Sequence, residues 1–133
     1  MASPDYIRAH GKPGSPEDLV NHTCVVDTNR RVPHRWVFER NATETAVHIQ
    51  GRFQVNSARA AMDLAVGGMG IANIPRFALS NTIEGGALVP LLEDFRSDSG
   101  PVSAVYLEGR ALPRKVRALI DFAAKDIQST ALF

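Results

Sequence analysis

The stretch FQVNSARAAMDLAVGGMGIANIP, residues 53–75, decides the fold of this chain. It begins with a short alternating segment, continues with apolar residues at helical spacing, and then has three glycines before an apolar segment that ends in Pro75. This order predicts a strand, a helix over residues 58–66, a glycine turn and a short buried strand over residues 71–74. Asn56 and Ser57 stand where the helix begins.

The pair Asn56-Ser57 has two interpretations that are compatible with each other. Serine and asparagine commonly cap helices, so the pair is explained by capping alone. The first turn of a helix also has free backbone N–H groups and partial positive charge, which suit an anion. The functional interpretation is that hydroxyl, amide and backbone N–H groups hold a carboxylate of a small ligand.

The glycines at 67, 68 and 70 do not form a nucleotide-binding loop. A dinucleotide fingerprint follows a strand and opens a helix, whereas these glycines follow a helix and open a strand. The lysine and hydroxyl residue of a P-loop are also missing after them. The glycines are therefore interpreted as a turn.

Strand and helix signals alternate along the rest of the chain. Residues 47–55 alternate with Gly51 among them, which predicts one strand with a bulge or two strands. Further strands are expected at residues 23–26, 36–38, 87–92 and 102–107. Helices are expected after Ser3-Pro4 and Ser15-Pro16 and, as the longest, at the C-terminal end. The alternation predicts an α/β class with a mixed sheet flanked by helices.

Composition excludes several functions. Fifteen Lys and Arg residues against fourteen Asp and Glu residues give a net charge of +1, and the basic residues are scattered, so this chain is a poor nucleic-acid binder. No apolar run suits a membrane span and no secretory signal is present, while the single cysteine, Cys24, fits a reducing, cytoplasmic compartment. The four histidines lack the spacing of a zinc helix, and no activated nucleophile is visible. We expect no metal, no cofactor and no enzyme activity.

Several segments, in order, resemble the effector-binding domain of LysR-type transcriptional regulators. The resemblance is carried by the stretches SPDYIRAHG at residues 3–11, PEDLVNHTC at 16–24, WVF at 36–38, AVGGMGIANIP at 65–75, LVPLL at 88–92 and LPRKVRALIDF at 112–122. No single stretch is specific, but together they cover nearly the whole chain. The resemblance implies a lobe similar to type 2 periplasmic binding proteins, in which a small effector binds in a cleft between two α/β lobes.

The resemblance also implies which parts of the domain are present. Residues 1–100 match the second lobe, and residues 101–133 match the crossover strand and the C-terminal helix that extend toward a first lobe. The winged helix-turn-helix that reads DNA has no counterpart here. The apolar stripe of the final helix would then fold back on this lobe, exchange with a second copy or form a dimer contact, so a homo-oligomer is expected.

By the same resemblance, the effector contacts are assigned to five residues. Asn56 and Ser57 present polar groups at the helix start, Arg59 in the first turn points toward an anionic ligand, and Ile74 and Pro75 line the floor of the cleft. Residues 33–36 are expected at its edge. The implied function is effector sensing that modulates DNA binding, and the alternatives are a solute-binding lobe of a transport protein or a small hydrolase or transferase.

Overall fold

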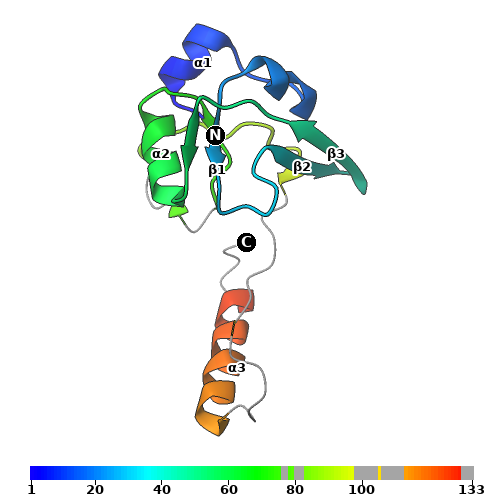
Figure 1. Ribbon diagram of the computed structural model, residues 1–133, viewed down its shortest axis with the longest axis vertical. Helices are drawn as coiled ribbons and strands as arrows, with labels where there is room; N and C mark the ends of the chain where they lie inside the picture. Colours follow the sequence, from blue (N-terminus) through cyan, green and yellow to red (C-terminus); the bar gives the residue numbers. More distant parts are fainter. Residues whose placement is uncertain (76–77, 80–82, 98–104, 106–112, 130–133) are drawn as a thin grey trace. The chain divides into compact units, whose positions relative to one another are not determined.

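The computed structural model covers Met1–Phe133 and describes all residues except 76–77, 80–82, 98–104, 106–112 and 130–133 (Figure 1). The chain divides into two compact units, Met1–Asp98 and Ser99–Phe133. The elements of the first unit, in chain order, are α1 (Pro4–His10), the 3₁₀ helix η1 (Pro16–Asn21), β1 (Cys24–Asp27), β2 (Arg35–Arg40), β3 (Thr43–His48), β4 (Phe53–Val55), α2 (Ala58–Val66), β5 (Ile71–Ala72) and β6 (Arg96–Ser97). The second unit contains α3 (Arg114–Ser129).

The first two helices begin as their caps predict. The Tyr6 N–H donates to the hydroxyl of Ser3, and Gly11 ends α1 with a φ of 83° that favours glycine. The second predicted helix is the 3₁₀ helix η1. The carboxylate of Asp18 accepts from the N–H groups of Ser15 and Gly14, at 2.9 Å each, and these bonds hold the pKa of Asp18 below its usual value.

The strands form two sheets, and the α/β class is confirmed. A parallel sheet has the order β4-β1-β5, and an antiparallel sheet has the order β3-β2-β6. The parallel and antiparallel strands of the predicted mixed sheet are thus divided between two sheets. α2 packs on the parallel sheet (Figure 1).

Gly51 lies where the chain crosses from one sheet to the other. The alternating stretch 47–55 forms two strands, β3 in the antiparallel sheet and β4 in the parallel one. A Cβ atom at Gly51 would overlap the carbonyl oxygen of Cys24 and lie 2.5 Å from Cγ2 of Val26. Glycine is therefore required here by the close approach of the backbone to β1.

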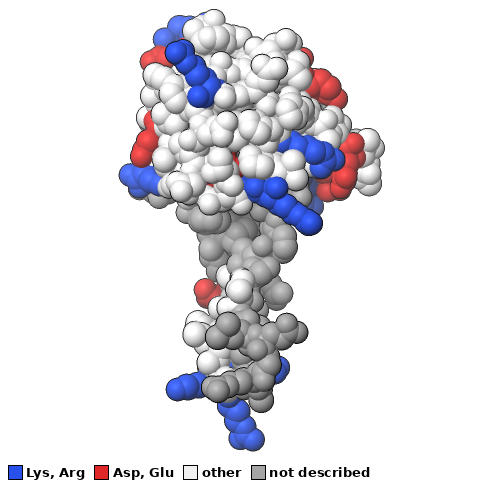
Figure 2. Space-filling model, viewed as in Figure 1, with Lys and Arg blue, Asp and Glu red and all other residues white. Residues whose placement is uncertain are grey.

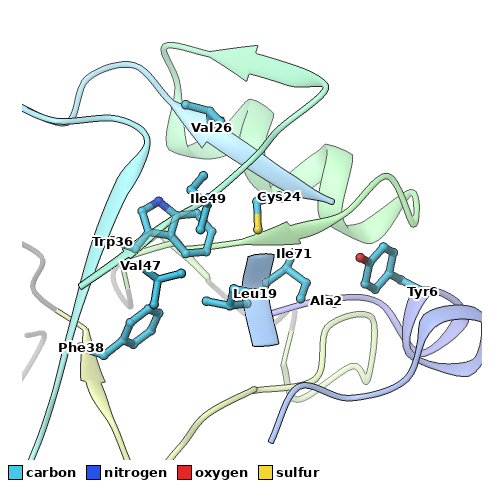
Figure 3. Packing of buried hydrophobic residues seen from close by; sticks show 10 residues of the cluster. All are labelled: Ala2, Tyr6, Leu19, Cys24, Val26, Trp36, Phe38, Val47, Ile49 and Ile71. Atoms are coloured by element: carbon cyan, nitrogen blue, oxygen red, sulfur yellow. The ribbon is translucent and has the colours of Figure 1, made fainter. Parts of the chain in front are cut away.

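Two clusters of buried apolar side chains form the core of the first unit. Figure 3 shows the first cluster, in which η1 and the hairpin of β2 and β3 meet the strands of the parallel sheet; it contains Ala2, Tyr6, Leu19, Cys24, Val26, Trp36, Phe38, Val47, Ile49 and Ile71. The second cluster lies between α2 and the other face of the parallel sheet and contains Val25, Ala61, Met62, Ala65, Ala72, Ile74, Leu79 and Leu88. The buried residues of α2 all belong to the apolar face predicted for this helix.

Three strand predictions differ from the structure, and one strand was not predicted. Residues 87–92 form only an isolated bridge between Val89 and Ala2, and β5 is shorter than predicted. The strand β6 was missed because Arg96 and Ser97 are polar and become a strand only by pairing with β2. Of the strand predicted at residues 102–107, only Val105 lies within the described residues; it is exposed and outside any strand.

The second unit confirms the predicted final helix, α3. Leu119, which belongs to its predicted apolar stripe, is exposed, as is Phe122. How this apolar surface is covered stays a prediction. Among the described residues, none of the helices has the length and apolar character needed to cross a bilayer.

The hydroxyl of Tyr6 joins α1 to the start of β1. It accepts from the Thr23 N–H at 3.0 Å and lies 3.2 Å from Nδ1 of His22. Tyr6 is buried, and burial raises the pKa of its phenol above 10.0. The neutral phenol is therefore the form that the folded chain favours.

We expect Tyr6→Phe to lower the free energy of unfolding by about 1–3 kcal/mol, because the Thr23 N–H loses its acceptor. A raised phenol pKa means that the folded state holds its proton more tightly than the unfolded state, so stability is lost as the pH rises above about 10. Urea unfolding at pH 8 and pH 10.5 measures both effects, and Tyr6→Phe should lose less stability than the wild type over this interval. An unchanged unfolding midpoint at pH 8 would contradict the role of this hydroxyl.

Candidate ligand-binding site at the carboxyl edge of the parallel sheet

The three strands of the parallel sheet end at one edge. β1 ends at Asp27, β4 at Val55 and β5 at Ala72, and Asp27 is paired with Val55. In open α/β sheets, ligands bind outside the carboxyl ends of the strands. The segments that follow the strands, beginning at residues 28, 56 and 73, are therefore the structural candidates for a binding site.

Hydrogen bonds join these segments to each other. The N–H and hydroxyl of Thr28 donate to the carbonyl of Val55 at 2.7 and 3.1 Å. Nη2 of Arg30 donates to the carbonyl of Asn73 at 3.4 Å, and the amide of Asn73 donates to the hydroxyl of Ser97 at 2.6 Å. Because Ser97 belongs to β6, this last bond links the edge to the antiparallel sheet.

The helix α2 begins directly after Asn56 and Ser57, as predicted, and its start lies at this edge. Asn56 is exposed and Ser57 is half-buried. The Ser57 hydroxyl accepts from the Ala60 N–H at 3.4 Å, so Ser57 is the cap of α2, and the bond is long enough to be weak. The first turn has no acidic side chain, so the positive end of the helix dipole is not neutralised by the helix itself.

The guanidinium of Arg59 lies along the surface of α2. Its Nε is 3.4 Å from the carboxylate of Asp63, one turn further along the helix, and both side chains are largely exposed. An exposed pair of this kind contributes at most about 1 kcal/mol. In this structure Arg59 is therefore directed along the helix, and contact with an anion at the start of α2 would need a different rotamer.

Ile74 and Pro75 differ in their environment. The side chain of Ile74 is 7% exposed and packs in the second core cluster. Pro75 is half-buried, and its carbonyl accepts from the Ala78 N–H at 3.0 Å. Of these two, Pro75 is available at the edge, whereas Ile74 supports it from below through the core.

Sequence reasoning did not assign three residues that the structure brings to this edge: Thr28, Arg30 and Asn73. Asn73 lies directly after a buried strand in the quoted stretch, and that position was a usable signal. Thr28 and Arg30 lie in a loop after β1, and they become site candidates only once β1 is known to be the central parallel strand.

The alternation of Trp36 with Phe38 predicts a core position, whereas the resemblance places residues 33–36 at the edge of a cleft; Trp36 is buried in the first core cluster, so the core prediction is confirmed. Its indole N–H has no hydrogen-bond acceptor among the described residues. A buried donor without an acceptor is costly, so the packing of Trp36 with neighbours such as Phe38 and Val47 has to offset this cost (Figure 3).

A surface recess of about 400 Å³ lies at the opposite edge of the parallel sheet. Its lining consists of Val20, Asn21, His22, Thr23, Gln50, Gly51 and Arg52, which precede β1 and β4. This recess is therefore separate from the segments at the carboxyl edge.

On the face of the first unit in Figure 2, basic and acidic side chains are interspersed, in keeping with the near-neutral net charge.

Comparison with known families decides the identity of the domain. Residues 1–128 match the family model described as the LysR substrate binding domain. The chain belongs to the LysR substrate-binding domain family. The periplasmic-binding-protein-like α/β fold that the resemblance implied is thereby confirmed.

Curated relatives of this LysR domain are transcriptional regulators. The regulator CrgA of Neisseria meningitidis serogroup C is 32% identical over 128 residues, which cover 96% of this chain and 42% of the relative. The regulator PtxR of Pseudomonas aeruginosa is 31% identical over 121 residues, covering 91% of this chain and 39% of PtxR. The chain therefore spans about two fifths of the length of these relatives.

Solved structures of LysR-type regulators have the same fold. The regulatory domain of CrgA from Neisseria meningitidis matches with a TM-score of 0.67 and 28% identity, covering 94% of this chain and 61% of that domain. The regulatory domain of AphB from Vibrio vulnificus matches with a TM-score of 0.64 and 28% identity, covering 93% of this chain and 62% of that domain. The LysR chain described here thus corresponds to about three fifths of each regulatory domain.

Proposed function

We propose that this chain is the effector-sensing part of a LysR-type transcriptional regulator and binds a small anionic metabolite at the carboxyl edge of the parallel sheet. The observation that carries the proposal is the convergence at this edge of the start of α2 with the polar groups of Thr28, Ser57 and Asn73. Hydroxyl, amide and backbone N–H groups at a helix start suit a carboxylate. Membership of a substrate-binding family supports the same conclusion.

The proposed site is one wall of a cleft. Residues 1–100 would form the second lobe, and residues 101–133 would extend toward a first lobe outside this chain. The separation of the chain into Met1–Asp98 and Ser99–Phe133 supports this division, as does its coverage of about three fifths of the related regulatory domains. Because only half of the contacts would be present, the chain alone should bind the effector weakly.

The regulatory role is supported over the two alternatives. The relatives are transcriptional regulators, which does not favour a transport lobe. A hydrolase or transferase would need an accessible nucleophile, whereas Cys24 is buried and burial raises the pKa of its thiol to about 12. In this proposal DNA is bound by a helix-turn-helix outside this chain, in a homo-oligomer in the cytoplasm, and the effector changes that binding.

We expect Ser57→Asp to abolish the binding of small carboxylates while α2 remains stable. Aspartate caps a helix as well as serine does, but its charge would repel an anion at the helix start. Ser57→Ala should weaken binding about ten- to hundredfold, because a hydrogen bond to a charged group contributes about 1.5–3 kcal/mol. Thermal-shift titration of the full-length regulator with a panel of aliphatic and aromatic carboxylates measures both changes.

Ser3→Ala is the matched control, because Ser3 caps α1 in the same way and lies outside the proposed site. It should lower stability like Ser57→Ala and leave carboxylate binding unchanged. If Ser57→Asp binds the carboxylates as tightly as the wild type does, the site is not at the start of α2.

A further inference from the structure

The strand β3 has an open edge. The antiparallel sheet has the order β3-β2-β6, so within the described part of the chain β3 pairs with β2 alone. The hairpin of β2 and β3 lies on the side of the unit away from α2 in Figure 1. β3 is six residues long, and an edge of this length is a template for another strand.

The geometry of the hairpin shows which backbone groups of β3 face outward. Arg40 pairs with Thr43 across a two-residue turn in which both residues have positive φ, at 52° and 59°. The residues that flank such a turn exchange both of their backbone hydrogen bonds, and bonded pairs then recur at every second residue. The bond from the Ile49 N–H to the His34 carbonyl, at 2.8 Å, has the same phase. The backbone groups of Glu44, Ala46 and His48 are therefore the ones that point away from β2.

The side chains of these three residues are also exposed. The burial of β3 alternates, so that Glu44, Ala46 and His48 face solvent while Val47 is buried in the core. The core face is covered by η1, whose Leu19 packs in the same cluster as Val47. The ring of His34 stacks on that of His48, with centroids 5.9 Å apart, on the solvent side.

β3 is self-complementary about Ala46. If two copies of β3 pair antiparallel around a two-fold axis at Ala46, Glu44 of each copy lies opposite His48 of the other. Opposite charges or a carboxylate–imidazole hydrogen bond across strands favour this register. A two-fold axis at Glu44 would instead place two carboxylates opposite each other, and an axis at residue 45 or 47 leaves Glu44 without an imidazole partner.

We propose that β3 is a contact surface between two copies of this chain, which pair antiparallel about Ala46 and continue the antiparallel sheet from one protomer into the other. The outward groups of Glu44, Ala46 and His48 then exchange backbone hydrogen bonds with the same residues of the second copy. This surface is independent of the proposed effector site, because it lies on the other sheet.

Disulfide trapping tests the surface and its register together. In a hydrogen-bonded antiparallel pair the Cα atoms are about 5.5 Å apart, which is within the range of a disulfide. Ala46→Cys should therefore form a covalent dimer in most of the 133-residue chain under mild oxidation. Cys24 does not compete, because it is buried and the pKa of its thiol is raised to about 12.

Glu44→Cys is the matched control. Residue 44 is on the same strand and equally open to solvent, but its two copies would be four residues apart along the paired strands, about 14 Å. At a chain concentration well above the dissociation constant of the dimer, it should give no covalent dimer under the same oxidation. Equal cross-linking of the two variants, or none in either, would overturn the proposed register.

Charge exchange provides a measurement that does not depend on thiols. In sedimentation equilibrium, Glu44→Lys should raise the dissociation constant of the dimer about three- to tenfold, since two cross-strand pairs are lost. Glu44→Lys combined with His48→Glu should restore it. A dimer that is unchanged by Glu44→Lys, or a wild-type chain that stays monomeric at all concentrations, contradicts the proposal.

Discussion

Gly51→Ala is expected to lower the free energy of unfolding by about 3 kcal/mol or more. The position of the new methyl group is fixed by the backbone, and no rotation of a side chain can make space for it. It would overlap the carbonyl oxygen of Cys24, which is backbone, and would lie 2.5 Å from Cγ2 of Val26. Both neighbours belong to β1, the central strand of the parallel sheet. Accommodating alanine would require β1 and the crossing segment to separate.

Two other glycines provide controls for Gly51→Ala. A Cβ at Gly14 would make an ordinary contact at 3.6 Å, so Gly14→Ala should change stability by less than about 0.5 kcal/mol. Gly11 has open space around it but a φ of 83° with a ψ of 169°, a region that is essentially restricted to glycine, so Gly11→Ala should cost about 1–3 kcal/mol from backbone strain alone. Urea unfolding of the three variants ranks these costs. A loss for Gly51→Ala that is no larger than that for Gly11→Ala would show that the backbone at Gly51 does not approach β1 as closely as described.

Leu19→Ala has the second largest expected effect, about 3 kcal/mol of destabilisation. Leu19 is 1% exposed and is the residue by which η1 enters the first core cluster (Figure 3). Its removal leaves a cavity in the first core cluster, where η1 packs against β3. Hydrogen exchange should then show that Leu19→Ala speeds the exchange of backbone amide protons more in the hairpin than in the parallel sheet.

The neighbouring residue supplies the control for Leu19→Ala. Val20 belongs to the same 3₁₀ helix and is 52% exposed, so Val20→Ala should change stability by less than about 0.5 kcal/mol. Equal shifts of the unfolding midpoint for the two variants would mean that η1 is held by its caps and turns, and that the packing of Leu19 contributes little.

The helices were predictable because their signals are local. Ser3 with Pro4 predicted the start of α1, Ser57 predicted the start of α2, and Gly67 follows the end of α2. A capping bond joins residues two or three positions apart, so the sequence contains both partners within one turn. The strands were less predictable, since β6 has a polar sequence and exists through pairing with a strand that is more than fifty residues earlier.

The candidate site was predictable at its helix and not at its loops. Asn56 and Ser57 could be selected because a polar pair before an apolar helical pattern has a local meaning. Thr28 and Asn73 are brought to the same edge by the order β4-β1-β5, which depends on contacts between distant residues. The core position of Ile74 also follows from that order, because β5 and the residues after it pack beneath α2.

By itself, the sequence determined the residues 53–75 as strand, helix, turn and strand, and it determined the α/β class and the LysR family. Those conclusions rest on periodicity, capping and residue order, which short-range interactions express directly. Only the tertiary structure decided that Gly51 separates two sheets, that three strands end together beside Ser57, and that β3 has an open edge. The physical reason is that strand order and register are set by burial and backbone pairing between segments far apart in the chain, for which no local pattern exists.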